Sequence, residues 1–290
     1  MKTPNEFWEN RKEMIHDRSL MDKPPLPTGI EWIDNLTDGI REGKLTVVAG
    51  APGSGKTALG LQICRNMVDT PETKALFISL EMTGEELVGR MFCEMNEIDY
   101  SAFRKGDIIS NFKNYNEMFE KYLQNIELDI VDDKGYTFSE VKSIIKERYG
   151  TEHQPDVIFI DYLQLISKRD HRDERAALDE FLRSLVELAK KTNIAIVLLS
   201  QLNREGQKDQ KEPDMTDLKG SGAIEQEAFV VIFVYKERKV KYGKEINKVF
   251  IKVAKNREGP VGKKEFLFFG KHFKFQEKRF EIETGKDGSL

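Results

Sequence analysis

The segment "GAPGSGKT", residues 50–57, joins three glycines to a lysine and a threonine in a spacing suited to holding phosphate groups. It fits the pattern G-x-x-x-x-G-K-[ST] in full, directly after an apolar strand-like run and before a helical pattern. Its glycines allow backbone N–H groups to converge on phosphate oxygens, and the next helix adds the positive end of its dipole. Lys56 would reach the β- and γ-phosphates of ATP, and Thr57 would offer its hydroxyl to Mg²⁺. Against the alternative of a glycine-rich turn that binds nothing, the sequence predicts a nucleotide-binding loop of Gly50, Ala51, Pro52, Gly53, Ser54, Gly55, Lys56, Thr57 and Ala58.

Three other polar residues, Glu81, Asp161 and Gln201, each follow an apolar run of strand length. In an open parallel sheet, ligands bind at the carboxyl ends of the strands. Asp161 would hold Mg²⁺ directly or through water. Glu81 would orient and polarise the attacking water, because Thr83 is the more natural cap of the following helix. Gln201 would contact the γ-phosphate or a water. The competing interpretations are that Asp161 only ends a strand, that Glu81 caps a helix and that Gln201 is an ordinary loop amide.

The elements that must position these residues alternate along the chain. Apolar runs without period-2 alternation indicate strands that are buried on both faces, as in a parallel sheet. Helical patterns lie between them, most clearly at 173–191. The sequence therefore predicts an α/β domain, a mostly parallel twisted sheet flanked by helices. The strand-like runs are 45–49, 75–80, 157–160, 194–199 and 229–234.

The last part of the chain has a different pattern. Residues 236–254 are typical of a hairpin that turns near Tyr242 and Gly243. Short strands follow at 264–269 and 272–276. We therefore expect antiparallel strands at the C-terminal end of the sheet.

Two cations, Lys255 and Arg257, directly follow the apolar run that ends this hairpin. Cations at strand ends are ordinarily solvated loop residues. If the strand before them runs antiparallel to 229–234, both cations leave the sheet away from their own phosphate loop. An arginine that is supplied to the γ-phosphate of a neighbouring subunit would account for that position.

Composition limits the classes of protein that fit. The chain has 290 residues, 39% of them hydrophobic, and a net charge of −4, so any nucleic-acid site must be local. No apolar run approaches the ~20 residues that cross a membrane, and the N-terminus lacks the apolar region of a secretory signal. Cys64 and Cys93 have no metal-ligand spacing, which fits a reducing compartment. We therefore expect a cytoplasmic protein without a membrane partner.

Seven segments carry a family resemblance. "GAPGSGKTA", "ISLEM", "VIFIDYLQLI", "IVLLSQLNR" and "MTDLKGSGAIEQEA" resemble, in order, five motifs of the DnaB-type replicative DNA helicases. "LPTGIEWIDNLTDGI" resembles the stretch before their phosphate loop, and "AKNREGPVG" resembles their final motif. The resemblance covers residues 26 to 262. A phosphate loop alone would indicate only an NTPase, whereas "DYLQL", "SQLNR" and "SGAIEQ" together are far more specific.

The resemblance implies a RecA-like P-loop NTPase core that uses ATP and Mg²⁺ and assembles as a homo-hexamer around single-stranded DNA. It implies translocation in the 5′→3′ direction with unwinding of duplex DNA, and it gives Lys255 and Arg257 the role in a neighbour's site. The loops after 201 and around 215–223 would face the central channel. The expected DNA contacts are Arg204, Lys219, Gly220, Ser221 and Gly222. The alternatives are a flexible turn before a helix for 218–222 and an ordinary surface-loop charge for Arg204.

The sequence departs from the family pattern at two positions. Lys219 and Gly220 stand where the family often has Arg-Glu, and Phe229 stands where an acidic residue is usual. We expect a linker or docking helix with a proline-rich spacer at 1–25, a helicase ATPase domain at 26–280 and a flexible tail at 281–290.

The family also has an N-terminal helical domain that contacts primase. Since the resemblance begins about 25 residues into the chain, the sequence is either a fragment or a minimal phage- or plasmid-like helicase. It would act in a bacterial cell or a phage host, and a primase or helicase loader would be a further partner.

Two other functions use the same core. A recombinase-type DNA-dependent ATPase would form open filaments rather than closed rings. A regulatory or loader-type ATPase would bind protein in place of DNA. Fold alone does not separate these functions, because one fold hosts many.

Overall fold

The computed structural model describes residues 3–5, 8–9, 12, 24–107, 112–133, 135–161, 174–203, 212–218, 221–241 and 244–278. Most of the predicted docking helix, and the whole predicted tail at 281–290, lie outside these residues. The domain boundaries therefore stay predictions. In the described part of the chain, no helix has the length and apolarity that crossing a membrane requires.

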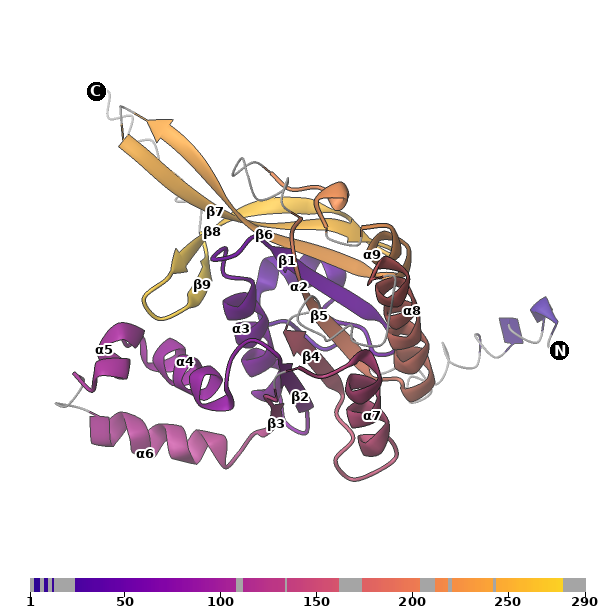
Figure 1. Ribbon diagram of the computed structural model, residues 1–290, viewed down its shortest axis with the longest axis horizontal. Helices are drawn as coiled ribbons and strands as arrows, with labels where there is room; N and C mark the ends of the chain where they lie inside the picture. Colours follow the sequence, from indigo (N-terminus) through magenta and orange to yellow (C-terminus); the bar gives the residue numbers. More distant parts are fainter. Residues whose placement is uncertain are drawn as a thin grey trace, which may run out of the picture.

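One nine-stranded sheet runs through the described structure in the order β3-β2-β4-β5-β1-β6-β7-β8-β9 (Figure 1). Neighbouring strands are parallel from β3 to β6 and antiparallel from β6 to β9. This confirms the predicted mostly parallel sheet with antiparallel strands at its C-terminal end. The strands are β1 Leu45–Gly50, β2 Lys74–Ser79, β3 Glu127–Val131, β4 Val157–Asp161, β5 Ala195–Gln201, β6 Val230–Lys241, β7 Lys244–Asn256, β8 Gly262–Phe269 and β9 Lys274–Glu277.

Helices cover both faces of this sheet (Figure 1). Successive strand residues point to opposite faces, so Phe77 packs in a core with α2, α3 and α4, while Leu76 and Ile78 pack with α7, α8 and α9. The predicted helix at 173–191 is α8. The helices are α2 Glu31–Thr37, α3 Lys56–Val68, α4 Gly84–Asn96, α5 Tyr100–Lys105, α6 Phe112–Leu123, α7 Phe138–Arg148, α8 Glu174–Thr192 and α9 Ser221–Glu227, with a short 3₁₀ helix η3 at Met215–Asp217.

The predicted hairpin is present, because β6 and β7 pair along their whole described lengths, from Val230 opposite Asn256 to Lys241 opposite Lys244. In Figure 1 both strands extend well beyond the rest of the sheet. Since β6 is parallel to β1 and β7 is antiparallel to β6, β7 carries the chain back toward the end of the sheet where the parallel strands begin. The direction expected for Lys255 and Arg257 is therefore correct.

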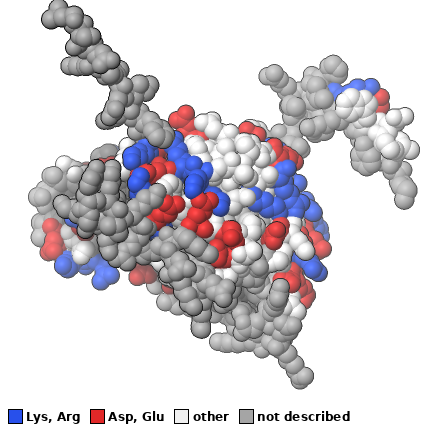
Figure 2. Space-filling view, turned by 90° about the horizontal axis from the view of Figure 1, so that it is seen from above, with Lys and Arg blue, Asp and Glu red and all other residues white. Residues whose placement is uncertain are grey.

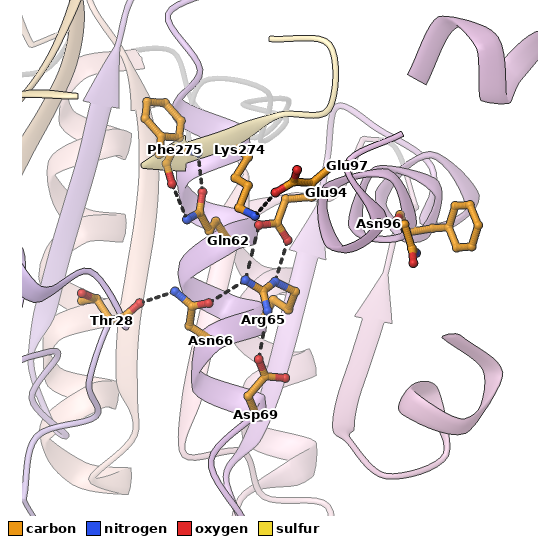
Figure 3. A network of polar contacts seen from close by, with 11 residues as sticks. Thr28, Gln62, Arg65, Asn66, Asp69, Glu94, Asn96, Glu97, Lys274 and Phe275 are labelled. Carbon is orange, nitrogen blue, oxygen red and sulfur yellow. Dashed lines mark hydrogen bonds and ion pairs between the residues drawn. The ribbon is translucent and has the colours of Figure 1, made fainter. Parts of the chain in front are cut away.

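Helix α3 is tied by polar contacts to elements on both sides of it (Figure 3). The Gln62 side chain donates to the Phe275 carbonyl at 2.9 Å and accepts from the Phe275 N–H at 2.8 Å, which fixes β9 against the helix. The Arg65 guanidinium lies 2.6 Å from the buried Glu94 carboxylate of α4 and 2.9 Å from Asp69. These contacts hold in place the helix whose first residue is Lys56.

Candidate nucleotide site

The loop between β1 and α3 has a backbone that requires glycine. Gly53 has a φ of +72° and Gly55 a φ of +103°, a region that L side chains rarely adopt. A Cβ on Gly55 would also stand 2.8 Å from Cζ of Phe275. Gly55 is the N-cap of α3 and supplies no side-chain cap, so the first N–H groups of a thirteen-residue helix point into the loop without one. This is the arrangement that binds an anion at a helix N-terminus.

Three of the predicted residues meet beside this loop. Lys56 Nζ lies 3.2 Å from Asp161 Oδ1 and 3.8 Å from Glu81 Oε2. Lys56 and Asp161 are buried, at 7% and 0% exposed, whereas the Glu81 side chain is half exposed. The sheet register accounts for the meeting, because Asp161 at the end of β4 pairs with Ser79 at the end of β2.

The predicted metal ligands have the chemistry for Mg²⁺. Asp161 Oδ2 is buried and has no hydrogen-bond partner among the described residues, while Thr57 Oγ1 lies 3.4 Å from Lys56 Nζ. The described residues hold no group of three or more His, Cys, Asp or Glu that could bind a metal by themselves. A site with one carboxylate and one hydroxyl suits Mg²⁺, which keeps waters and phosphate oxygens in its coordination shell.

Glu81 is not used as a helix cap. The Thr83 hydroxyl accepts a hydrogen bond from the Glu86 N–H at 3.3 Å, and the Glu86 carboxylate accepts one from the Thr83 N–H at 3.2 Å. This capping box begins α4 and confirms Thr83 as its N-cap. The Glu81 carboxylate therefore stays beside Lys56 at the mouth of the loop.

A cavity of about 350 Å³ opens over the loop and contains both predicted and unpredicted residues. Gln201 reaches it because β5 pairs with β1 so that Gln201 stands opposite Gly50. The sequence did not single out Met82, Arg90, Phe268, Gly270 and Phe273. The residues that line the cavity are Ala51, Pro52, Gly53, Gly55, Lys56, Thr57, Ala58, Glu81, Met82, Arg90, Gln201, Phe268, Gly270 and Phe273.

The unpredicted side of the cavity is aromatic and cationic. Arg90 Cζ of α4 stands 4.4 Å from the centroid of the Phe273 ring, in the turn between β8 and β9. Phe268 stacks on Phe275 with the ring centroids 4.4 Å apart. In the sequence, Arg90 looks like one more charge on an amphipathic helix, and the aromatic residues lie more than 150 positions away. The pairing of the strands from β6 to β9 brings them to the loop.

Lys255 and Arg257 lie at the opposite end of the sheet, where the parallel strands begin. Lys255 pairs with Val231, which pairs with Val47 near the start of β1, whereas the phosphate loop begins at Gly50, the last residue of β1. Burial, and then the nearby Arg257 guanidinium, lower the pKa of Lys255 below its ordinary value. Neither cation can serve the phosphate loop of its own chain from this end.

The predicted DNA contacts are only partly covered. Arg204, Lys219 and Gly220 lie outside the described residues, and the side chain of Ser221 does too, although its backbone begins α9. Gly222 is half-buried in the same helix. These contacts stay predictions.

The segments next to these contacts are held to the sheet. Leu202 and Leu218 pair as an antiparallel bridge, and the Asn203 N–H donates to the Asp217 carbonyl at 2.7 Å. On the face that Figure 2 shows, the described lysines and arginines stand among aspartates and glutamates rather than in one large positive surface.

Residues 25–277 match the family described as the DnaB-like helicase C terminal domain. The chain belongs to this family. It is 34% identical over 277 residues to the replicative DNA helicase DnaC of Bacillus subtilis, a match that covers 93% of this chain and 60% of that protein. Identity to the replicative DNA helicase DnaB of Geobacillus stearothermophilus is also 34%, with the same two shares. The chain thus spans about 60% of the length of these relatives.

Solved structures agree with this DnaB-like assignment. One of them, a structure of an ATPase domain, superposes with a TM-score of 0.80 at 26% identity, covering 96% of this chain and all of that one. A DnaB-like replicative helicase, from a structure that also describes its interactions with primase, gives a TM-score of 0.77 at 26% identity, covering 95% of this chain and 67% of that one. The RecA-like fold and the family resemblance are thereby confirmed.

Proposed function

We propose that this DnaB-like domain is the ATP-driven motor of a replicative DNA helicase. The observation that carries the proposal is the meeting of Lys56, Asp161 and Glu81 at the carboxyl ends of the parallel strands, beside the cavity that Lys56 and Glu81 line. Family membership supports it, because the relatives are named replicative DNA helicases. The whole activity is a proposal for this chain, which spans only part of those proteins.

In this proposal the nucleotide phosphates lie on the loop and on the N-terminus of α3, with Lys56 against the β- and γ-phosphates. Thr57 and Asp161 hold Mg²⁺, which when bound neutralises phosphate charge. A water attacks the γ-phosphorus as the bond to ADP breaks, and Glu81 accepts the proton of that water. Gln201, opposite Gly50 in the register, contacts the γ-phosphate or the water.

The site is completed by a second copy of the chain. Lys255 and Arg257 lie at the end of the sheet opposite their own phosphate loop. Since they cannot reach that loop, they act on the γ-phosphate of a neighbour. This requires an assembly in which the phosphate loop of one chain lies against Lys255 and Arg257 of the next chain, beside its helix α9. A hexameric ring satisfies the requirement, and it agrees with the family resemblance.

The DNA contacts come from the segment that follows β5 and from the first residues of α9. Arg204, Lys219, Gly220, Ser221 and Gly222 contact the phosphates of the strand in the ring's channel. Because such contacts release counterions, Lys219→Ala should weaken DNA binding at every sequence and flatten the salt dependence by about one phosphate. An unchanged salt slope would remove Lys219 from the contacts.

Primase is the partner with the most support, because one structural neighbour is described together with its own interactions with primase. A helicase loader and a cytoplasmic location, in bacteria or in a phage host, also belong to the proposal. So does the 5′→3′ direction of translocation.

Unwinding of a forked duplex, measured with and without ATP, tests the proposal. We expect unwinding, DNA-stimulated ATP hydrolysis, and rings in particle images taken with single-stranded DNA and a non-hydrolysable ATP analogue. Open filaments and no unwinding would favour a recombinase-type ATPase. ATP hydrolysis that DNA does not stimulate would favour the loader-type ATPase.

A further inference from the structure

Lys236, a residue that the proposed roles do not use, contacts the phosphate loop from a distant part of the sequence. Strand β6 pairs with β1 so that Val234 stands opposite Gly50, which places Lys236 just beyond the end of β1. Its ammonium nitrogen donates a hydrogen bond to the main-chain carbonyl of Gly53 at 2.7 Å. The contact spans 183 positions of the chain.

This contact fixes one peptide unit of the loop at both ends. The carbonyl of the Gly53–Ser54 peptide accepts from Lys236, while its N–H, on Ser54, donates to the Ala51 carbonyl at 3.0 Å. Gly53 has a φ of +72°, and within 4 Å of a Cβ at this position there is nothing that would hold it by packing. Without the Lys236 hydrogen bond, this glycine peptide could rotate, and ordering it when a ligand binds would cost affinity.

Lys236 is itself positioned by the aromatic residues beside the loop. Its ammonium lies 5.9 Å from the centroid of the Phe268 ring, within the range of a cation–π contact. Phe268 stacks on Phe275, whose backbone is hydrogen-bonded to Gln62 of α3. The lysine is thus aimed at the loop by the β8–β9 hairpin, which is fixed to the helix that the loop begins.

We propose that Lys236 is a positioning residue that holds the phosphate loop in its nucleotide-binding conformation. The inference rests on the proposed function, since it concerns the same nucleotide site. Lys236 acts through the Gly53 carbonyl and not on the nucleotide itself. Because ATP and ADP use the same loop, its loss should weaken both equally and leave kcat little changed.

The test is the affinity of Lys236→Met for ATP and for ADP, measured by calorimetry. Methionine keeps a long side chain and removes the donor. Because the lost hydrogen bond has a charged donor, we expect about tenfold weaker binding of both nucleotides and a similar rise in KM. Lys236→Arg, which keeps charge and donors, should restore binding to within about twofold.

A matched control is Lys248→Met, on the adjacent strand β7, where the ammonium pairs with Glu265 instead of the loop. It should bind both nucleotides like the wild type. Unchanged affinity in Lys236→Met, equal loss in the control, or absence of rescue by arginine would overturn the inference. Weakened ATP binding with normal ADP binding would do so too, because it would make Lys236 a γ-phosphate ligand. If the wild type itself fails to bind nucleotide, the proposed function fails first and takes the inference with it.

Discussion

Arg257 donates a hydrogen bond to the main-chain carbonyl of Gln226, at the C-terminal end of α9. Lys255 donates likewise to the carbonyl of Glu225. The last carbonyls of a helix lack partners within the helix and carry its negative dipole end, so cations stabilise them. Helix α9 directly follows Lys219 and Gly220. The two cations proposed to act on a neighbour are thus attached to the helix that adjoins the proposed DNA contacts.

Mixing two inactive variants tests the action on a neighbour. Lys56→Ala removes the loop lysine, and Arg257→Ala removes the arginine. Because the two residues lie at opposite ends of the sheet, some interfaces in a mixed assembly will join a loop that has Lys56 to a neighbour that has Arg257. We expect each variant alone to lose hydrolysis and the mixture to regain part of it. Co-assembly is verified by pull-down of differently tagged subunits, and co-assembly without recovery would contradict the prediction.

Substitution of Glu81 separates binding from hydrolysis. In Glu81→Gln the neutral amide can no longer accept the proton of the attacking water, so we expect hydrolysis to fall by roughly 100-fold or more. Nucleotide binding should persist, since Lys56 keeps Asp161 as its closer partner at 3.2 Å. Lys56→Ala is the contrasting variant, which should weaken binding as well. The measurements are single-turnover hydrolysis and equilibrium binding; normal turnover in Glu81→Gln would exclude the water-activating role.

The proximity of Lys56, Glu81 and Asp161 could be predicted because it depends on a local rule. The carboxyl ends of parallel strands share one edge, so residues that end such strands meet without any knowledge of the packing. The direction of Lys255 and Arg257 followed from the same kind of reasoning, since one hairpin turn sets the direction of the strand that precedes them.

The rest of the cavity could not be predicted, because it depends on how distant strands pair. Phe268 and Phe273 reach the loop through the register of β6 to β9, which no short pattern specifies. Lys236 reaches the loop through the register of β6 on β1, which no short pattern specifies either. Strand β3 was missed for a different reason. Its sequence "ELDIV" lies at the sheet edge, is partly exposed and carries two acids, which are depleted in strands.

Gly55→Ala should cost more stability than the same change at another left-handed glycine. Both Gly55 and Gly106 have positive φ, and an alanine in such a conformation costs about 1 kcal/mol or more. At Gly55 the added Cβ also meets the Phe275 ring at 2.8 Å, whereas at Gly106 nothing lies within 4 Å. Urea unfolding of the two variants measures the difference. Equal losses would mean that the Phe275 ring moves aside at no cost.

Glu212 should make stability depend on pH in acid. Lys252, at 2.8 Å, and Lys263 both pair with its carboxylate, and their hydrogen bonds hold the pKa of Glu212 below its usual 4.5. A carboxylate with a lowered folded-state pKa contributes stability above the unfolded value and loses it as pH falls through the folded value. We therefore expect Glu212→Gln to lower Tm by roughly 1–2 °C at pH 7, with a difference that shrinks below pH 4.5. Glu117→Gln, which removes an exposed pair with Lys113 at 4.0 Å, is the control and should leave Tm unchanged throughout. A Glu212→Gln difference that stays constant down to about pH 3 would show that the side chain contributes by packing and not by its charge.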